Sequence, residues 1–172
     1  SAFNWCSQGG CTSVKNQRSC GSCWAFATSG VFESVIKIQD GVGRDLSEQY
    51  LVSCNTDGWG CGGGSWAFDY FEDQVPPGEP EAGAVYESDF PYVASDSACS
   101  PPHAHHEKIA SWSFVGSWGS VPPVADIKQV IRDNGPVAVT LCCGPAFHDY
   151  DGGVFDTDES SSCSGGPVNH GV

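Results

Sequence analysis

The sequence contains no methionine, few basic side chains and no long apolar run. Its uninterrupted apolar stretches fall well short of the roughly 18 residues of a membrane span, so we expect no contact with a membrane. Only seven lysines and arginines stand against 21 aspartates and glutamates, and the resulting formal net charge of -14 repels a phosphate backbone. Nucleic acid is therefore not an expected partner. No internal repeat or extended low-complexity segment is visible.

Cysteine, glycine and apolar residues are plentiful. A composition of 40% hydrophobic residues over 172 positions is that of a globular chain that buries about 70% of its unfolded surface. Ten cysteines exceed ordinary cytosolic usage, which favours an oxidising compartment, either outside the cell or in a lysosome or vacuole. The first residues lack the features of a signal peptide, so we expect that any targeting or pro-segment has been removed or was never included.

The strongest periodic signal predicts a helix over residues 23–38. Ala27, Val31, Val35 and Ile38 recur at helical spacing and share one face, and the glycines that begin at Gly41 end the helix. Shorter helices are predicted at 46–53, 66–73 and 124–133, and a strand at 137–141. Residues 75–106 read as a loop-rich connection, and 110–121 and 137–172 as mainly strands and turns. The pattern indicates an α+β protein with two lobes and a groove between them.

Cys20 and Cys23 form a C-x2-C pair, which by itself suggests a redox pair or half of a zinc site. A zinc site needs a second pair of ligands at compatible spacing, and we find none. Cys23 differs from the other cysteines because it opens the predicted helix, where free N–H groups and the helix dipole stabilise a thiolate.

The helix dipole alone does not explain a reactive thiolate. Lowering the pKa of a thiol from about 8.5 to roughly 3.5 to 4 takes on the order of 6 to 7 kcal/mol. A helix terminus supplies at most about 2 kcal/mol. A histidine from the other lobe has to supply most of the remainder, and the candidates are His103, His105, His106, His148 and His170.

Several motifs resemble those of the papain-like cysteine peptidases. The segment at residues 20–24 fits the C-G-[SA]-C-[WY] signature, and His170 lies within the interval of about 130 to 150 residues downstream where that family has its histidine. Further motifs follow in the family's order: Cys61-Gly62-Gly63-Gly64, Phe90-Pro91-Tyr92, Asn134-Gly135-Pro136-Val137, Phe147 and Tyr150 before Gly152-Gly153-Val154-Phe155, and Val168-Asn169-His170-Gly171-Val172.

The resemblance implies a papain-like two-lobe fold, with a helical left lobe, a β-barrel-like right lobe and an active-site groove between them. Residues 9–110 would form the mainly helical lobe that carries the nucleophile. Residues 1–8 and 111–172 would form the mainly β lobe that carries the histidine, with its C-terminal part missing.

The same resemblance assigns roles to individual residues. Cys23 would be the nucleophile and His170 its ion-pair partner and later general acid. Gln17 would donate a side-chain N–H to the oxyanion hole, together with the backbone N–H of Cys23. The residues that would bind substrate are Gly63, Gly64 and Asn169 along the peptide backbone, and Thr140, Gly171 and Trp66 around the main specificity pocket.

We therefore expect a thiol endopeptidase, a hydrolase that cleaves polypeptide through an acyl-enzyme and is made as a zymogen with an autoinhibitory propeptide. No cofactor and no metal are expected. The cluster of His103, His105 and His106 is most simply solvated, although a metal site or a loop that binds a substrate carboxylate would use the same residues. The acidic run at residues 79–89 reads as a solvated loop, and His148 as a surface residue.

The chain departs from the family at three points. The family orients its histidine with an asparagine roughly 15 to 20 residues further on, whereas this sequence ends two residues after His170. Asn169 does not replace it, because adjacent strand residues point to opposite faces. Either the last strands are missing or belong to a second chain, or the protein lacks this residue. Arg18 stands where the family usually has glycine.

Cysteine pairing favours the missing segment, because an odd number of cysteines remains once Cys23 is set aside. Cys163 matches a family cysteine whose partner lies in that segment. Cys142 and Cys143 are adjacent and have no assigned partner. The pairs implied or expected are Cys20 with Cys61, Cys54 with Cys99, and Cys6 with Cys11.

Three alternative interpretations remain open. Cys23, His170 and Gln17 could be structural, as a buried cysteine, a core histidine and a loop cap. The protein could be a catalytically inactive papain-like binding or scaffold protein, which the missing asparagine favours. A C-x2-C thiol oxidoreductase would require Cys20 and Cys23 to exchange with each other.

Overall fold

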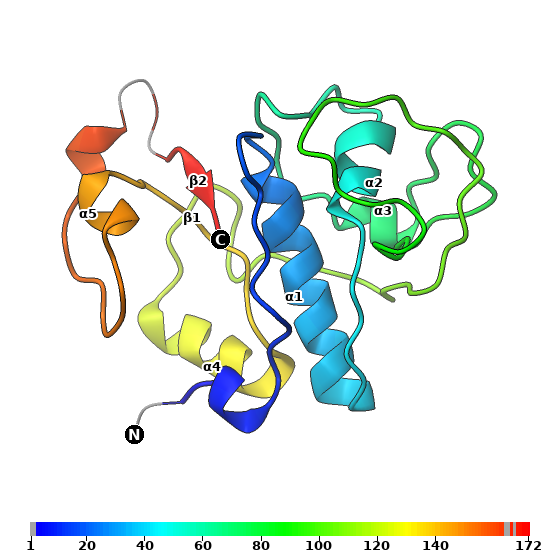
Figure 1. Ribbon diagram of the computed structural model, residues 1–172. Coiled ribbons are helices and arrows are strands. Elements are labelled where there is room, and N and C mark those ends of the chain that lie inside the picture. The colour runs from blue at the N-terminus through cyan, green and yellow to red at the C-terminus, as the bar shows by residue number, and fades with distance from the viewer. Residues whose placement is uncertain (1–2, 164–165, 167) are drawn as a thin grey trace.

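The computed structural model describes residues 3–163, 166 and 168–172. Helices make up most of its regular structure, and they lie on both sides of the long helix α1 (Figure 1). The elements in chain order are η1 (Cys6–Gln8), α1 (Cys23–Asp40), α2 (Glu48–Cys54), α3 (Asp69–Glu72), α4 (Val124–Asn134), β1 (Thr140–Leu141), α5 (Pro145–His148), η2 (Ser160–Ser162) and β2 (His170–Gly171).

Helix α1 confirms the helix predicted over residues 23–38 and continues to Asp40. It ends as expected at Gly41, which adopts a φ of 72° and donates its N–H to the carbonyl of Lys37 over 3.1 Å. Glycine adopts this left-handed conformation without steric cost, which makes it a common helix terminator.

The face of α1 that is most deeply buried is not the predicted one. Phe32 and Ile36 are 5% and 4% exposed and belong to the hydrophobic core, which also includes Tyr50 of α2 and Phe71 of α3. The predicted stripe is only half-buried at Val31, Val35 and Ile38. It faces the segment after α4, where a Cβ atom at Gly135 would lie 3.2 Å from Val35. Helix α1 therefore packs on two sides.

An ion cluster that is buried at Glu33 and Glu48 fastens the N-terminal segment to α1 and α2. The Nζ atom of Lys15 lies 2.6 Å from Glu33, 2.9 Å from Glu48 and 2.7 Å from Asp45. Burial raises the pKa of Glu48 to about 7, and the nearby charge of Glu33 adds to this, while Lys15 acts in the opposite direction. These carboxylates together raise the pKa of Lys15 despite its burial.

Of the four disulfides described, three join segments that are distant in sequence, and Cys6–Cys11 closes a short local loop. Cys20–Cys61, Cys54–Cys99 and Cys6–Cys11 are the pairs expected above. The fourth corrects an expectation, because Cys163 pairs with Cys142 and not with a cysteine outside the sequence. A strand-and-turn pattern does not reveal this pair, since it depends on how residues 142–163 fold back.

The second half of the chain contains less sheet than the sequence predicts. Within the described residues, the one sheet consists of β1 and β2, paired antiparallel with Leu141 opposite His170. Backbone hydrogen bonds between Val139 and Val172, of 2.8 and 2.9 Å, extend this pairing by one step. The described segment 110–121 forms turns and bends instead of strands.

Other boundaries also differ from prediction. Helix α3 covers only Asp69–Glu72 of the predicted 66–73, whereas α2 and α4 lie within one or two residues of their predicted ends. Helix α5 was not predicted. Its first turn is capped by the Glu159 carboxylate, which accepts backbone N–H groups from Gly144, Ala146 and Phe147 at 2.9, 2.8 and 3.1 Å. A cap so distant in sequence leaves no local signal.

The loop-rich segment 75–106 is not simply solvated. Glu79 is 8% exposed and Ala82, Ala84 and Val85 are at most 3% exposed, so this part of the connection belongs to the interior. None of the helices described is long and apolar enough to cross a lipid bilayer.

Candidate active site

Cys23 is a free, half-buried thiol at the first residue of α1. The preceding Ser22 is fully buried, and its carbonyl accepts the N–H groups of Ala25 and Phe26 at 2.9 and 3.1 Å. Its hydroxyl lies 2.6 Å from the hydroxyl of Tyr92. These contacts fix the start of the helix, where unpaired backbone N–H groups favour a negative charge on the sulfur.

Gln17 lies on the loop that precedes Cys23 and is held at both ends. Its side-chain Nε2 donates to the carbonyl of Cys20 over 2.9 Å, and its own carbonyl accepts the hydroxyl of Tyr92 over 2.9 Å. The Cys20–Cys61 disulfide fixes the same loop. Arg18 has a φ of 55°, a conformation that glycine adopts more easily, which gives a physical reason for the family's preference at this position.

The glycine-rich turn at residues 60–64 packs directly on Trp24. Gly60 and Gly63 exchange two backbone hydrogen bonds of 3.1 Å, and the indole N–H of Trp24 donates to the Gly60 carbonyl over 3.2 Å. A Cβ atom at Gly64 would come within 2.6 Å of the indole ring. Only glycine fits this approach, which brings the turn against the residue that follows Cys23.

His170 lies on β2, which Figure 1 shows beside the N-terminal part of α1. The neighbouring Gly171 contacts this helix, because a Cβ atom there would lie 3.7 Å from the Cα atom of Trp24. The fold therefore brings the strand of His170 to the helix turn of Cys23, although no hydrogen bond joins these two side chains, both of which are described. Burial lowers the pKa of His170, and the charge of His148 lowers it further.

The predicted specificity residues come together around the same strand pair. Thr140 is the register partner of Gly171. The Trp66 ring lies 3.6 Å from the position that a Cβ atom on Gly171 would occupy. Asn169 has a structural contact that the sequence did not indicate. Its side chain accepts the N–H of Cys143 over 2.7 Å and donates to the carbonyl of Cys143 over 3.0 Å.

Cys143 was not among the residues expected in the site. It is a free, half-buried thiol whose Sγ lies 3.8 Å from Nε2 of His148. Burial raises the pKa of Cys143, and the charges of Glu159 and Cys23 raise it further, which opposes a thiolate at this position. The adjacent cysteines at the end of the predicted strand were the only signal.

The histidine cluster corrects a prediction. His103 and His105 are not solvated, because their side chains are 7% and 3% exposed and both contact Glu79. His106 is more exposed, and its ring stacks on Tyr86 at 4.0 Å between centroids. None of the three touches the residues around Cys23 in the hydrogen bonds described.

A cavity of about 610 Å³ lies between the N-terminal segment and α1 and reaches Arg18 and Tyr92 beside the Gln17 loop. Charged side chains line much of it, among them Lys15, Glu33, Glu48 and Arg18. A second cavity of about 350 Å³ lies along the half-buried stripe of α1, near Val31, Val137 and Val172. Neither is lined by Cys23 or His170.

Comparison with known proteins gives the family of the chain. The model of the papain family of cysteine proteases matches residues 1–172. Stem bromelain from Ananas comosus is 32% identical over 172 residues, which cover 99% of this chain and 74% of that protein. Probable cysteine protease RD21B from Arabidopsis thaliana is 37% identical over 99% of this chain and 35% of its own length. The chain also spans about a third (32%) of the length of falcipain-2b from Plasmodium falciparum.

Solved structures show the same fold. Bromelain from Ananas comosus in complex with the E64 inhibitor superposes with a TM-score of 0.76 and 28% identity, covering 98% of this chain and 72% of that one. A structure from a study of the mite allergens Blo t 1 and Der p 1 superposes with a TM-score of 0.67 and 30% identity, over 81% of this chain and 44% of that one. The expected papain-like α+β fold is thereby confirmed, and the chain belongs to the papain family of cysteine proteases.

Proposed function

We propose that the protein is a cysteine endopeptidase in which Cys23 is the nucleophile and His170 the acid–base partner. The observation that carries this proposal is the packing of β2 against the first turn of α1, with Gly171 on Trp24. The helix turn that begins with a free thiol thus lies next to a strand that carries an imidazole, which supports a pairing of the two groups for nucleophilic catalysis by cysteine.

The reaction proceeds in two stages. The Cys23 thiolate attacks the peptide carbonyl, and His170 protonates the leaving amine to give an acyl-enzyme. Water, deprotonated by His170, then attacks the acyl carbonyl and releases the acid and the thiolate. In both stages the oxyanion is stabilised by the backbone N–H of Cys23 and the side-chain amide of Gln17, which turns from the Cys20 carbonyl toward the cleft.

Charge within the site makes the two catalytic groups interdependent. Because burial lowers the pKa of His170, its imidazolium form depends on a negative partner, and the thiolate of Cys23 is that partner. The extended substrate would lie between Gly63 and Gly64 on one wall and Asn169 on the other. Its main side chain would enter the pocket formed by Trp66, Thr140 and Gly171.

The division into lobes is part of this proposal. Residues 9–110 form the lobe of the nucleophile, and residues 1–8 and 111–172 the lobe of the histidine. Polypeptide is the substrate, and an autoinhibitory propeptide keeps the zymogen inactive. The four disulfides are those of an oxidising compartment, so we propose secretion or residence in a lysosome or vacuole.

A C-terminal segment, on this or a second chain, would supply the orienting asparagine. Stem bromelain is longer than this chain, which covers 74% of it. The apolar cavity near Val31, Val137 and Val172 offers such a segment a surface to pack on. Intact mass spectrometry of the protein from its source tests this, because a mass of 18.1 kDa with no second chain would contradict it.

The second candidate is a catalytically inactive papain-like binding protein. The missing hydrogen bond between Cys23 and His170 is the observation that favours it. It predicts a groove that binds extended peptides without cleaving them, and it gives Gln17 no role in turnover.

Covalent labelling with E64 at pH 5, followed by peptide mapping, distinguishes the two candidates, and Cys143 serves as the internal control thiol. We expect labelling at Cys23 alone, and loss of both labelling and peptide hydrolysis in Cys23→Ser. Labelling of Cys143 at an equal rate, or labelling of Cys23 only above pH 8, would show that no activated pair exists. Turnover retained by Cys23→Ser would exclude the assignment of the nucleophile.

A further inference from the structure

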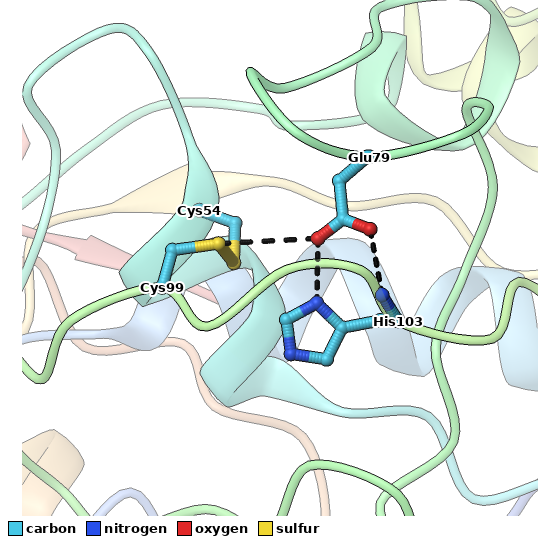
Figure 2. A group of neighbouring side chains, drawn as sticks. All are labelled: Cys54, Glu79, Cys99 and His103. Carbon is cyan, nitrogen blue, oxygen red and sulfur yellow. Dashed lines mark hydrogen bonds and ion pairs between the residues drawn. A yellow bond between two sulfur atoms is a disulfide. The ribbon is translucent and has the colours of Figure 1, made fainter.

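A second cluster of titratable groups lies outside the candidate active site, around Glu79. Figure 2 shows ligand-type atoms of Cys54, Cys99, His103 and Glu79 converging, all within 4.8 Å of one another. The two sulfur atoms are bonded to each other, so they are not free to bind a metal. Cys99 therefore has no proton to donate to Glu79, and their 3.9 Å separation is a packing contact. The cluster must be explained by the carboxylate and the histidines.

The Glu79 side chain is fully buried and accepts hydrogen bonds at both oxygens. Oε2 accepts the backbone N–H of His103 over 2.8 Å, and Oε1 lies 2.5 Å from Nδ1 of the same ring. Nε2 of His105 lies 3.1 Å from Oε2. Burial raises the pKa of Glu79, but these hydrogen bonds from His103 and His105 outweigh it and lower the pKa overall. Glu79 is therefore a carboxylate, which only accepts hydrogen bonds.

His105 is enclosed by acceptors on both sides of its ring. Nε2 faces the Glu79 carboxylate, and Nδ1 lies 2.9 Å from the carbonyl oxygen of Gly83. A neutral imidazole has one N–H and one bare nitrogen, so it would place a lone pair against one of these oxygens. Rotating the ring by 180° would replace both nitrogens by carbons.

We propose that His105 is a buried imidazolium that forms an ion pair with Glu79 and that this pair fastens the loop of residues 79–105 only while the ring holds both protons. The other titratable groups that face the ring are His103 of the same loop and Tyr50 of α2. The ring centroid of Tyr50 lies 5.4 Å from that of His105 and 5.9 Å from that of His103. His103 needs one proton, at Nδ1, for its bond to Glu79. Tyr50 is 1% exposed and its hydroxyl has no hydrogen-bond partner among the described residues, so it does not neutralise the pair.

The loop closed by this pair supports the wall of the candidate active site. Tyr92 lies within it and holds Ser22 and the carbonyl of Gln17. Asp96, also within it, accepts the N–H of Cys61 over 2.6 Å beside the glycine-rich turn. His105 and Glu79 are thus positioning residues that make this wall most firmly fastened at acid pH. The inference concerns the folded loop and does not depend on the proposed peptidase activity.

Nitrogen-15 NMR of the histidine rings tests the proposal on the wild-type chain. At pH 7.5 we expect both ring nitrogens of His105 to show the shifts and attached protons of an imidazolium. A bare nitrogen on His105 at pH 7.5 would overturn the proposal, whatever any variant does. The exposed His106, which has a single acceptor partner in Asp89, is the internal reference and is assigned with His106→Gln.

Hydrogen exchange provides a second measurement. After correction for intrinsic rates, the protection factor of the His103 amide should fall by up to about tenfold per pH unit once His105 loses a proton. Glu79→Gln offers a neutral partner in place of the carboxylate, so it should make His105 neutral at pH 7.5 and remove this pH dependence. A protection profile that is identical in Glu79→Gln and wild type would contradict the role of the pair.

Discussion

Gly171 packs against Trp24, with its Cβ position 3.7 Å from the Trp24 Cα atom. Both residues are chain neighbours of the proposed catalytic pair, since Trp24 follows Cys23 and Gly171 follows His170. Because the contact involves the backbone of both residues, no long side chain sets the spacing of α1 and β2. We expect the thiol and the imidazole, which are not hydrogen-bonded in this structure, to meet on a substrate by rotation of their own side chains.

The Gln17 amide tests the proposed oxyanion hole. We expect Gln17→Ala to lower kcat by about 10²- to 10³-fold, because one preorganised donor to the oxyanion is lost, while KM changes little. Steady-state kinetics with a fluorogenic peptide measures this. Gln39→Ala, at an exposed position near the end of α1, is the matched control and should keep the wild-type kcat. A large rise in KM with kcat unchanged would assign Gln17 to substrate binding instead.

The glycine-rich turn allows a matched pair of substitutions. Gly64→Ala should destabilise the protein by about 1 to 3 kcal/mol, because the added methyl group would lie 2.6 Å from the Trp24 indole and the core resists overpacking. Gly62→Ala should cost much less, since among the described residues no atom beyond its chain neighbours lies within 4 Å of its Cβ position. Urea unfolding followed by tryptophan fluorescence measures both. Equal losses for the two variants would mean that the close approach to Trp24 does not govern this turn.

Glu48 makes stability depend on pH in a defined direction. Its pKa in the fold, about 7, is higher than the ordinary glutamate value of 4.5, so between these pH values the folded state holds the proton that the unfolded state has released. Stability contributed by this group is present below about pH 4.5 and is lost as the pH rises toward 7. Through this group the wild type should lose up to about 3 kcal/mol of its free energy of unfolding between pH 4.5 and 7.5, and Glu48→Gln should not show this loss.

Urea unfolding at several pH values measures this effect, and Glu81→Gln, at an exposed position, is the control. The control should follow the wild-type profile. If Glu48→Gln also follows it, the proton is not taken up at residue 48, and burial does not oppose ionisation there.

Ser47 caps α2 and also holds the following loop. Its hydroxyl accepts the N–H of Tyr50 over 3.0 Å and donates to the carbonyl of Phe90 over 2.5 Å. Ser47→Ala should therefore lower the free energy of unfolding by about 1 to 2 kcal/mol, while Ser7→Ala, at an exposed position, should leave it nearly unchanged. Thermal unfolding monitored by circular dichroism compares the two, and a Ser47→Ala variant as stable as wild type would contradict the role of the cap.

The sequence predicted the features that depend on local order along the chain. Helix α1 followed from apolar periodicity and the glycine at residue 41, and α4 from its own pattern and the glycine after it. The order of the motifs around Cys23 and His170 was sufficient to identify the family, because each motif lies within a few residues of the chain.

Several contacts between distant segments were decided by the tertiary structure alone, although the Cys20–Cys61 and Cys54–Cys99 disulfides were expected from the family's motifs. The core side of α1 is the one that α2 and α3 cover, which periodicity within the helix does not indicate. Cys142 pairs with Cys163, and Glu159 caps α5, because residues 142–163 fold back on themselves. The protonation proposed for His105 depends on two acceptors, one 26 and the other 22 residues away in sequence. Local sequence determines which helices can form, whereas burial and charge depend on which residues meet in space, and that is settled only by packing.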